Sequence, residues 1–245
     1  MTLTQIFDDA VRLGLTLVQV CDWAPLASMT GRELDEVRTA AEHRGLTLEA
    51  GTKGVAPDHL RTHLRIAQQL GSSLLRSMLH SPEYQPNRAQ AEADLREVLG
   101  EFEAAGVVLA LETYEQVPTA TVVEIVDAID SPWLGICLDP GNVIAALEHP
   151  DDVIDMTASR VVNVHVKDFA FTRNADMVGF RLAGAPMGQG LLDYAHLRRA
   201  VDPDRRGINL IIEQWVPWHG DSESTIARET TWAGHAVDYL TNWKD

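Results

Sequence analysis

Short apolar segments alternate with longer amphipathic stretches along the whole of this chain. The apolar segments are rich in Val, Ile and Leu and lack strict polar alternation, a pattern typical of parallel strands that helices cover on both faces. Seven segments fit this description: 16–22, 47–52, 74–80, 107–113, 134–139, 161–168 and 208–215. The alternation therefore predicts an α/β protein with a mostly parallel sheet.

The stretches between these segments carry apolar residues at three- and four-residue spacing, as amphipathic helices do. The predicted helices are 3–13, 33–43, 58–70, 88–105 and 122–129. Thr30 and Glu33 have the spacing of a capping box at one helix start. Because no Pro/Ser-rich linker or low-complexity tract interrupts the series, we expect residues 1–245 to form a single domain.

A strand–helix series of this length forms either a closed (β/α)₈ barrel or an open doubly wound sheet. An open dinucleotide-binding sheet would place a GxGxxG turn after its first strand, and no such motif follows 16–22. Polar residues instead gather at strand ends, where TIM barrels carry their chemistry. We therefore predict a TIM barrel that lacks its first strand, because the chain begins with a helical pattern and shows seven strand segments.

Composition excludes several classes of partner. The 245 residues have a formal net charge of −16, which repels the phosphates of nucleic acids. No apolar run approaches the length of a membrane span, so we expect no membrane association. Two cysteines in apolar surroundings and an N-terminus without a signal-peptide pattern indicate a cytoplasmic protein.

Four potential metal ligands stand at the ends of four successive strand segments. They are Glu112, Asp139, His165 and Glu213. Neighbouring parallel strands lie about 4.8 Å apart, so residues at equal height converge on one point. Three carboxylates and one imidazole suit Mn²⁺ best, with Mg²⁺ or Co²⁺ as alternatives. We expect a divalent ion here, because charged groups beside buried strands need partners.

Other polar residues near strand ends are candidates for contacts with a substrate. His80 and Asp22 are better explained as residues of the pocket wall than as ligands. Lys167 shares a strand face with His165; it either points into the site or forms an ion pair with Asp168 or another acid. Arg181 is a candidate clamp for a carboxylate or phosphate, and Trp215 for stacking on a sugar.

Several motifs together resemble the sugar phosphate isomerase/epimerase group of xylose isomerase-like barrels. They are LALET, GICLDPGN, VVNVHVKDF, MGQGLLDY and LIIEQW. The resemblance implies a metal held by Glu112, Asp139, His165 and Glu213, with the two glutamates also acting as acid and base. Asn142, a further candidate for substrate binding, stands where ketose 3-epimerases carry a histidine. Residues 169–190 look like the long loop of a subgroup that includes 3-oxo-isoapionate decarboxylase-like proteins.

Three functions fit these features. The first is a metal-dependent isomerase or epimerase of a small keto-sugar, in which Glu112 and Glu213 move protons through an enediolate. The second is a lyase, which decarboxylates a 3-keto sugar acid or cleaves a 3-keto glycoside through the same enediolate. The third is a non-catalytic subunit of a larger assembly, or a homo-oligomer, since a missing strand leaves an edge that invites association. The net charge of −16 argues against a related DNA-repair nuclease.

Overall fold

The computed structural model describes residues 2–21 and 23–244. The chain divides into two compact units, residues 1–137 with 160–162 and residues 138–159 with 163–245. The expectation that all 245 residues behave as one domain stays a prediction. Asp22, which the sequence places at the wall of a pocket, lies outside the described residues.

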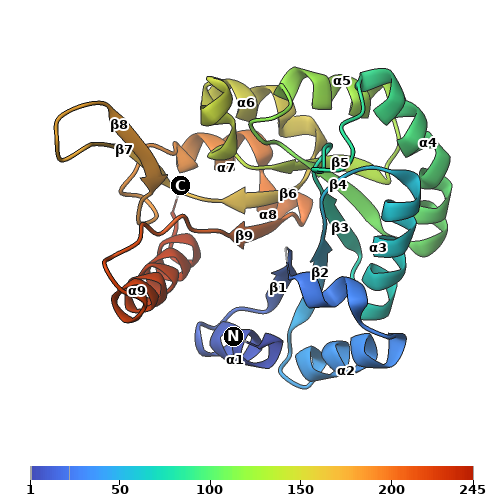
Figure 1. The fold of residues 1–245 in the computed structure, drawn as a ribbon, viewed down its shortest axis with the longest axis horizontal. Helices are drawn as coiled ribbons and strands as arrows, with labels where there is room; N and C mark the ends of the chain where they lie inside the picture. The colour runs from blue at the N-terminus through green and yellow to red at the C-terminus, as the bar shows by residue number, and fades with distance from the viewer. Residues whose placement is uncertain (1, 22, 245) are drawn as a thin grey trace. The chain divides into compact units, whose positions relative to one another are not determined.

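Within the described residues, seven strands lie side by side in chain order, β1-β2-β3-β4-β5-β6-β9 (Figure 1). Their bounds are β1 Leu17–Val20, β2 Thr47–Gly51, β3 Leu74–Ser77, β4 Val108–Glu112, β5 Leu134–Leu138, β6 Val161–Val166 and β9 Asn209–Ile212. The pairs β1–β2, β2–β3, β3–β4, β4–β5 and β6–β9 are parallel. Each predicted segment contains one of these strands, so the seven-stranded α/β architecture is confirmed.

Helices connect the strands of each unit. In the first unit they are α1 Leu3–Arg12, η1 Ala24–Ser28, α2 Gly31–Glu42, α3 Pro57–Leu70, α4 Arg88–Ala105 and α5 Thr119–Ile129. The others are η2 Asn142–Ala146, α6 Pro150–Thr157, η3 Ala158–Arg160, α7 Tyr194–Val201, α8 Pro203–Arg206 and α9 Ser222–Thr241. No strand precedes α1 among the described residues, as the sequence predicted. None of the described helices has the length and apolarity needed to cross a membrane.

Local signals in the sequence explain where several helices begin and end. The backbone N–H of Thr30 donates to Glu33 Oε2 at 2.7 Å, and Glu33 N donates back to Thr30 Oγ1 at 3.4 Å, which forms the predicted capping box of α2. Helix α4 ends at Gly106, whose φ of 66° is costly for residues with a Cβ. These caps fix the helix ends, and hence where each following strand begins.

The core of the first unit lies between its helices and its strands. Leu95 and Phe102 of α4 and Leu109 and Leu111 of β4 are all fully buried. Burial of one such side chain stabilises the folded state by about 1.5–3 kcal/mol. This packing holds β4, and the glutamate at its end, in a fixed position.

The segment 169–190, expected to be a loop, contains an antiparallel hairpin in the second unit. It consists of β7 Phe169–Arg173 and β8 Phe180–Gly184. Its turn includes Met177 at φ 64° and Gly179 at φ 74°. The hairpin follows β6 directly, so its base lies close to the residues at the end of that strand.

Candidate metal centre

Three of the predicted ligands meet in the second unit at the carboxyl ends of β5, β6 and β9. Asp139 directly follows β5, His165 lies in β6, and Glu213 directly follows β9. The Nδ1 atom of His165 lies 3.0 Å from Glu213 Oε2 and 3.8 Å from Asp139 Oδ2. Asp139 and His165 are buried, and the Glu213 side chain is 37% exposed. Solvent therefore reaches this cluster from the side of Glu213.

The two carboxylate oxygens of Asp139 make different contacts. Its Oδ1 accepts hydrogen bonds from the backbone N–H groups of Gly141 at 2.9 Å and Asn142 at 3.1 Å. This local loop of the Asx-turn type turns Oδ2 towards the cluster. A Cβ at Gly141 would lie 3.3 Å from Lys167 Cε and 3.4 Å from Asp139 Oδ1, so the turn has little room for a side chain.

Lys167 lies among the predicted ligands and is 1% exposed. Its Nζ is 2.8 Å from Asp139 Oδ2, 2.8 Å from Glu213 Oε1 and 3.1 Å from Asn142 Oδ1. It also lies 4.0 Å from the centroid of the Trp215 ring. An ammonium group has three N–H donors, and these three acceptors occupy all of them. The structure combines the two expected arrangements, since Lys167 points into the cluster and forms its ion pairs there with Asp139 and Glu213.

Asp168 accepts hydrogen bonds from backbone N–H groups near the site, instead of forming the ion pair with Lys167 that the sequence offered. Its Oδ1 accepts from the N–H groups of Phe169 at 2.8 Å and Leu192 at 3.1 Å. Its Oδ2 accepts from Gly190 N at 2.9 Å. These bonds tie the base of the hairpin to the segment that follows it.

The charges of this cluster support one another. Burial raises the pKa of Glu213, but the hydrogen bond from His165 and the charge of Lys167 outweigh it and lower that pKa to about 2. Burial lowers the pKa of Lys167, but the charges of Asp139 and Glu213 outweigh this effect and raise it. Glu213 is therefore a carboxylate and Lys167 an ammonium at neutral pH.

Glu112, the fourth predicted ligand, lies at the end of β4 in the first unit and is 1% exposed. It forms an ion pair with the buried Arg76 of β3. Arg76 Nη1 also donates to Thr52 O at 3.1 Å. In the β4–β5 ladder Glu112 is opposite Cys137, two residues before Asp139. Sequence reasoning missed Arg76, although a charged residue inside an apolar strand indicates a buried partner.

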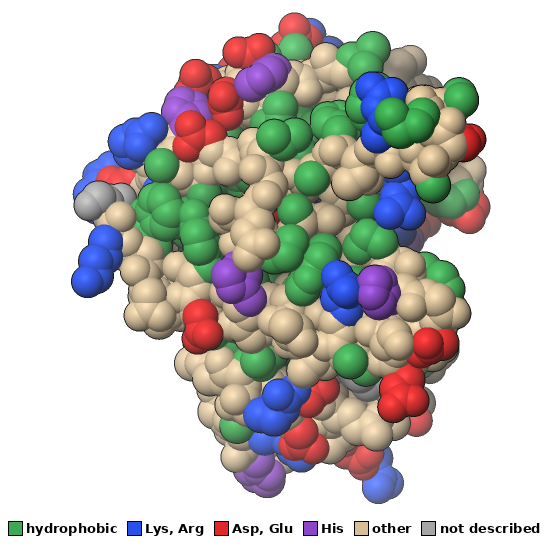
Figure 2. All heavy atoms as spheres, turned by 90° about the vertical axis from the view of Figure 1, so that its left-hand side faces the viewer, with side chains coloured by type: hydrophobic (Ala, Val, Ile, Leu, Met, Phe, Trp, Pro, Cys, Tyr) green, Lys and Arg blue, Asp and Glu red, His purple; other side chains and the backbone are tan. Residues whose placement is uncertain are grey.

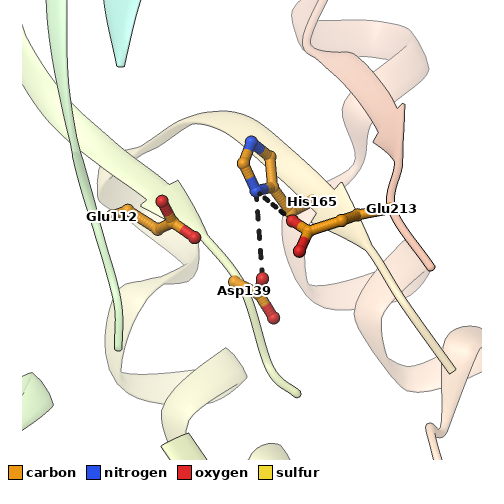
Figure 3. A group of neighbouring side chains, drawn as sticks. All are labelled: Glu112, Asp139, His165 and Glu213. Carbon is orange, nitrogen blue, oxygen red and sulfur yellow. Dashed lines mark ion pairs between the residues drawn. The ribbon is translucent and has the colours of Figure 1, made fainter. Parts of the chain in front are cut away.

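One ligand atom from each of Glu112, Asp139, His165 and Glu213 lies within 4.8 Å of the others (Figure 3). Carboxylate oxygens with one imidazole nitrogen are the donors that Mg²⁺, Mn²⁺ and Co²⁺ accept. Lys167 and Arg76 offset part of the negative charge of the three carboxylates. The residues present therefore fit a divalent cation.

The predicted substrate contacts occupy different surroundings. Asn142 is buried and touches Lys167, whose Nζ also lies over the half-buried Trp215. His80, in the first unit, has its Nε2 3.2 Å from Pro86 O. Arg181 is exposed in β8 and lies opposite Thr172 of β7. Among these residues, the second unit brings Asn142 and Trp215 to Lys167. The roles of all of them in substrate binding stay predictions.

The family described as "Xylose isomerase-like TIM barrel" matches residues 7–243. The chain belongs to this family. The predicted fold class and the resemblance to this family are both confirmed.

The proteins that this chain resembles include a decarboxylase and an epimerase. The chain is 46% identical over 238 residues to the 3-oxo-isoapionate decarboxylase of Pectobacterium atrosepticum, which covers 97% of this chain and 86% of that protein. A xylose isomerase-like TIM barrel protein from Mycobacterium smegmatis, in complex with magnesium, has a TM-score of 0.68 and 19% identity, with 97% of this chain and 89% of the other covered. The D-psicose 3-epimerase of Clostridium cellulolyticum H10 has a TM-score of 0.72 and 16% identity, with 98% and 92% covered. The last two show that the fold is shared.

Proposed function

We propose that this protein is a divalent-metal-dependent lyase that removes CO₂ from a small 3-keto sugar acid. The observation that carries the proposal is the 46% identity to a 3-oxo-isoapionate decarboxylase over 97% of the chain. The cluster of Glu112, Asp139, His165 and Glu213 supports it, since it offers a site for the cation. Of the two enzymatic functions that the sequence left open, the lyase is thus favoured over the isomerase.

The chemistry of a 3-keto acid explains what such a site must do. The bond between C2 and the carboxyl carbon breaks, CO₂ leaves, and the electron pair of that bond forms an enolate that the keto oxygen stabilises. A proton then adds to C2 and gives a ketone. A bound divalent cation supplies positive charge to oxygens of the substrate and so lowers the energy of the enolate. The bond-breaking step itself needs no general base.

The ion pairs of the two glutamates agree with this requirement. Both oxygens of Glu213 are engaged, Oε1 by Lys167 at 2.8 Å and Oε2 by His165 at 3.0 Å. Glu112 is paired with Arg76. To remove a proton from carbon, either glutamate would first have to give up one of these contacts. In this proposal Lys167 keeps Asp139 and Glu213 ionised and in position.

Isomerisation or epimerisation of a keto-sugar is the second candidate. The fold shared with D-psicose 3-epimerase favours it, whereas the depressed pKa of Glu213, about 2, makes this carboxylate a weak base and disfavours it. Asn142 at the position of the epimerase histidine disfavours it. The two reactions differ in a measurable product, since epimerisation exchanges carbon-bound hydrogen with solvent and releases no CO₂.

The experiment is an assay of the purified protein with Mn²⁺ or Mg²⁺ against a panel of 3-keto sugar acids and keto-sugars in D₂O. CO₂ release and deuterium incorporation are followed together. We expect CO₂ release from a 3-keto acid, its loss in Asp139→Asn, and its retention in Glu229→Gln, a matched change at an exposed acid of α9. If deuterium enters a keto-sugar and no CO₂ is released, the protein is an epimerase or isomerase and the lyase proposal is wrong. No turnover of either class with metal bound would favour the non-catalytic subunit.

A further inference from the structure

The second unit has an apolar groove of about 710 Å³ between the β7–β8 hairpin and the segment of η2 and α6. We call this surface the hairpin groove. Its large apolar lining residues are Ile144, Leu147, Phe171, Phe180, Leu182 and Leu191. Leu147 is 95% exposed, Phe180 61%, Leu191 60% and Phe171 51%. Figure 2 presents the side on which β7 and β8 lie in Figure 1, and hydrophobic side chains come to the surface there in several groups.

The register of the hairpin places its apolar side chains on one face. Phe171 is opposite Leu182, and Arg173 is opposite Phe180. Since side chains of a strand alternate between faces, these four residues share the face that lines the groove, while Thr172 and Arg181 share the other. The Arg173 guanidinium lies 4.4 Å from the centroid of the Phe180 ring. The apolar face therefore ends in one positive charge near the tip.

The hairpin is attached to the rest of its unit near its base. Gly184 N donates to Trp215 O at 3.0 Å, and Leu191 N donates to Phe169 O at 2.8 Å. Residues 171–181 are all exposed. A two-stranded ribbon is marginally stable in water by itself, so a surface that covers its apolar face would stabilise it.

Backbone strain occurs beside the same surface. Leu147 has a φ of 63°, and Met177 in the hairpin turn has a φ of 64°. A left-handed conformation costs a residue with a Cβ about 1–2 kcal/mol. In Leu147 this conformation presents an almost fully exposed apolar side chain. Leu147 is the C-cap of η2, so its conformation belongs to the helix end, but an apolar side chain exposed to this degree is typical of a contact surface.

The charges on the two walls of the hairpin groove are opposite. The wall formed by η2 and α6 contributes Glu148 and Asp151 to the lining, with Asp152 and Asp155 following in α6. On the hairpin, Arg173 lies on the face that carries Phe171, Phe180 and Leu182, while Arg181 lies on the opposite face. One surface thus carries an apolar centre, the acids Glu148 and Asp151 on one side and the guanidinium of Arg173 near the hairpin tip, so two copies can offer each other opposite charges.

We propose that a second copy of this chain covers the hairpin groove in a two-fold symmetric dimer. The apolar faces of the two hairpins pack into the grooves of the opposite copies, and Arg173 of each copy lies against the Glu148 and Asp151 wall of the other. The contact gives two chains with a net charge of −16 a local attraction that offsets their long-range repulsion. A small apolar ligand in the groove would make no contact with the charges of Glu148, Asp151 and Arg173.

The test is sedimentation equilibrium of the full chain over a range of concentrations, with and without Mn²⁺. We expect a particle of twice the 27.0 kDa chain mass. Phe180→Asp and Arg173→Glu should each weaken self-association by about 10-fold or more. Glu148→Lys with Asp151→Lys should weaken it similarly. Combining Arg173→Glu with the two lysine substitutions should restore it, because both walls are then reversed.

Two control variants distinguish this surface from general effects of charge and exposure. Ile226→Asp changes an apolar residue of α9 that is 55% exposed, and Arg32→Glu changes a guanidinium that is 89% exposed on α2. Both should leave the mass unchanged, and circular dichroism should confirm that every variant is folded. A wild-type monomer at all concentrations overturns the proposal. So does a dimer that Phe180→Asp and Arg173→Glu leave intact, or a triple charge reversal that fails to recover association.

Discussion

Replacement of Lys167 by Met should destabilise the metal-free protein far more than the metal-bound protein. Met keeps much of the length of the lysine stem and removes the ammonium group. The carboxylates of Asp139 and Glu213 then lose a cation at 2.8 Å from each. Removing one partner of a buried ion pair costs about 3–5 kcal/mol, because the remaining charge is left uncompensated. Since Glu213 is partly exposed, the lower end of this range applies best.

The assay is thermal unfolding of wild type and Lys167→Met in EDTA and in saturating Mn²⁺. About 2–4 °C of Tm per kcal/mol is typical for a chain of this size, so we expect a loss of about 6–12 °C in EDTA. In Mn²⁺ the loss should be much smaller, because the dication supplies the missing positive charge to the same carboxylates. Lys244→Met, at an exposed position, is the control. An equal loss with and without metal would show that Lys167 acts through packing alone, and no loss in EDTA would refute the argument from buried charge.

Two further predictions concern the first unit. Arg76→Met should lower the free energy of unfolding by about 3–5 kcal/mol, because Glu112 is left as a buried carboxylate without its guanidinium partner. Urea denaturation measures this change. If the added substitution Glu112→Gln restores stability, the unpaired carboxylate is the cause. Burial lowers the pKa of both His59 and His63 from 6.5. The folded state therefore binds fewer protons than the unfolded state below pH 6.5, so stability falls as the pH drops through that value. Urea denaturation at several pH values between 7.5 and 5.5 gives the free energy of unfolding as a function of pH. This free energy should fall less steeply with pH in a His59→Asn/His63→Asn variant than in the wild type, and an equally steep fall would contradict this reasoning.

The strands were predictable because their burial appears directly in the sequence. β5 consists of buried residues throughout, and its segment reads as a continuous apolar run. The predicted segments extend past the observed strands at their ends, as at Asp139 and Glu213, because the apolar pattern does not show where hydrogen bonding stops. Two of the predicted ligands, Asp139 and Glu213, therefore lie just past the ends of β5 and β9, on the side of the sheet where such barrels carry their chemistry.

The partners of the buried charges were not predictable, because they depend on contacts between distant residues. Lys167 and Glu213 are 46 positions apart, and Arg76 and Glu112 are 36 positions apart. Spacing along the chain says which residues share a strand face, but it does not say which acid a given cation will meet. The hairpin was missed for another reason. Its strands are short and exposed, with Phe171 and Phe180 on one face, and Gly and Asn residues interrupt the segment, so the sequence gives only a weak strand pattern.

The central claim is that Glu112, Asp139, His165 and Glu213 hold one divalent cation. The most direct measurement is anomalous diffraction from crystals grown with saturating Mn²⁺. We expect one anomalous peak at about 2.0–2.6 Å from an atom of each of the four side chains. A cluster without a peak under these conditions, or manganese bound by a different set of residues, would contradict it.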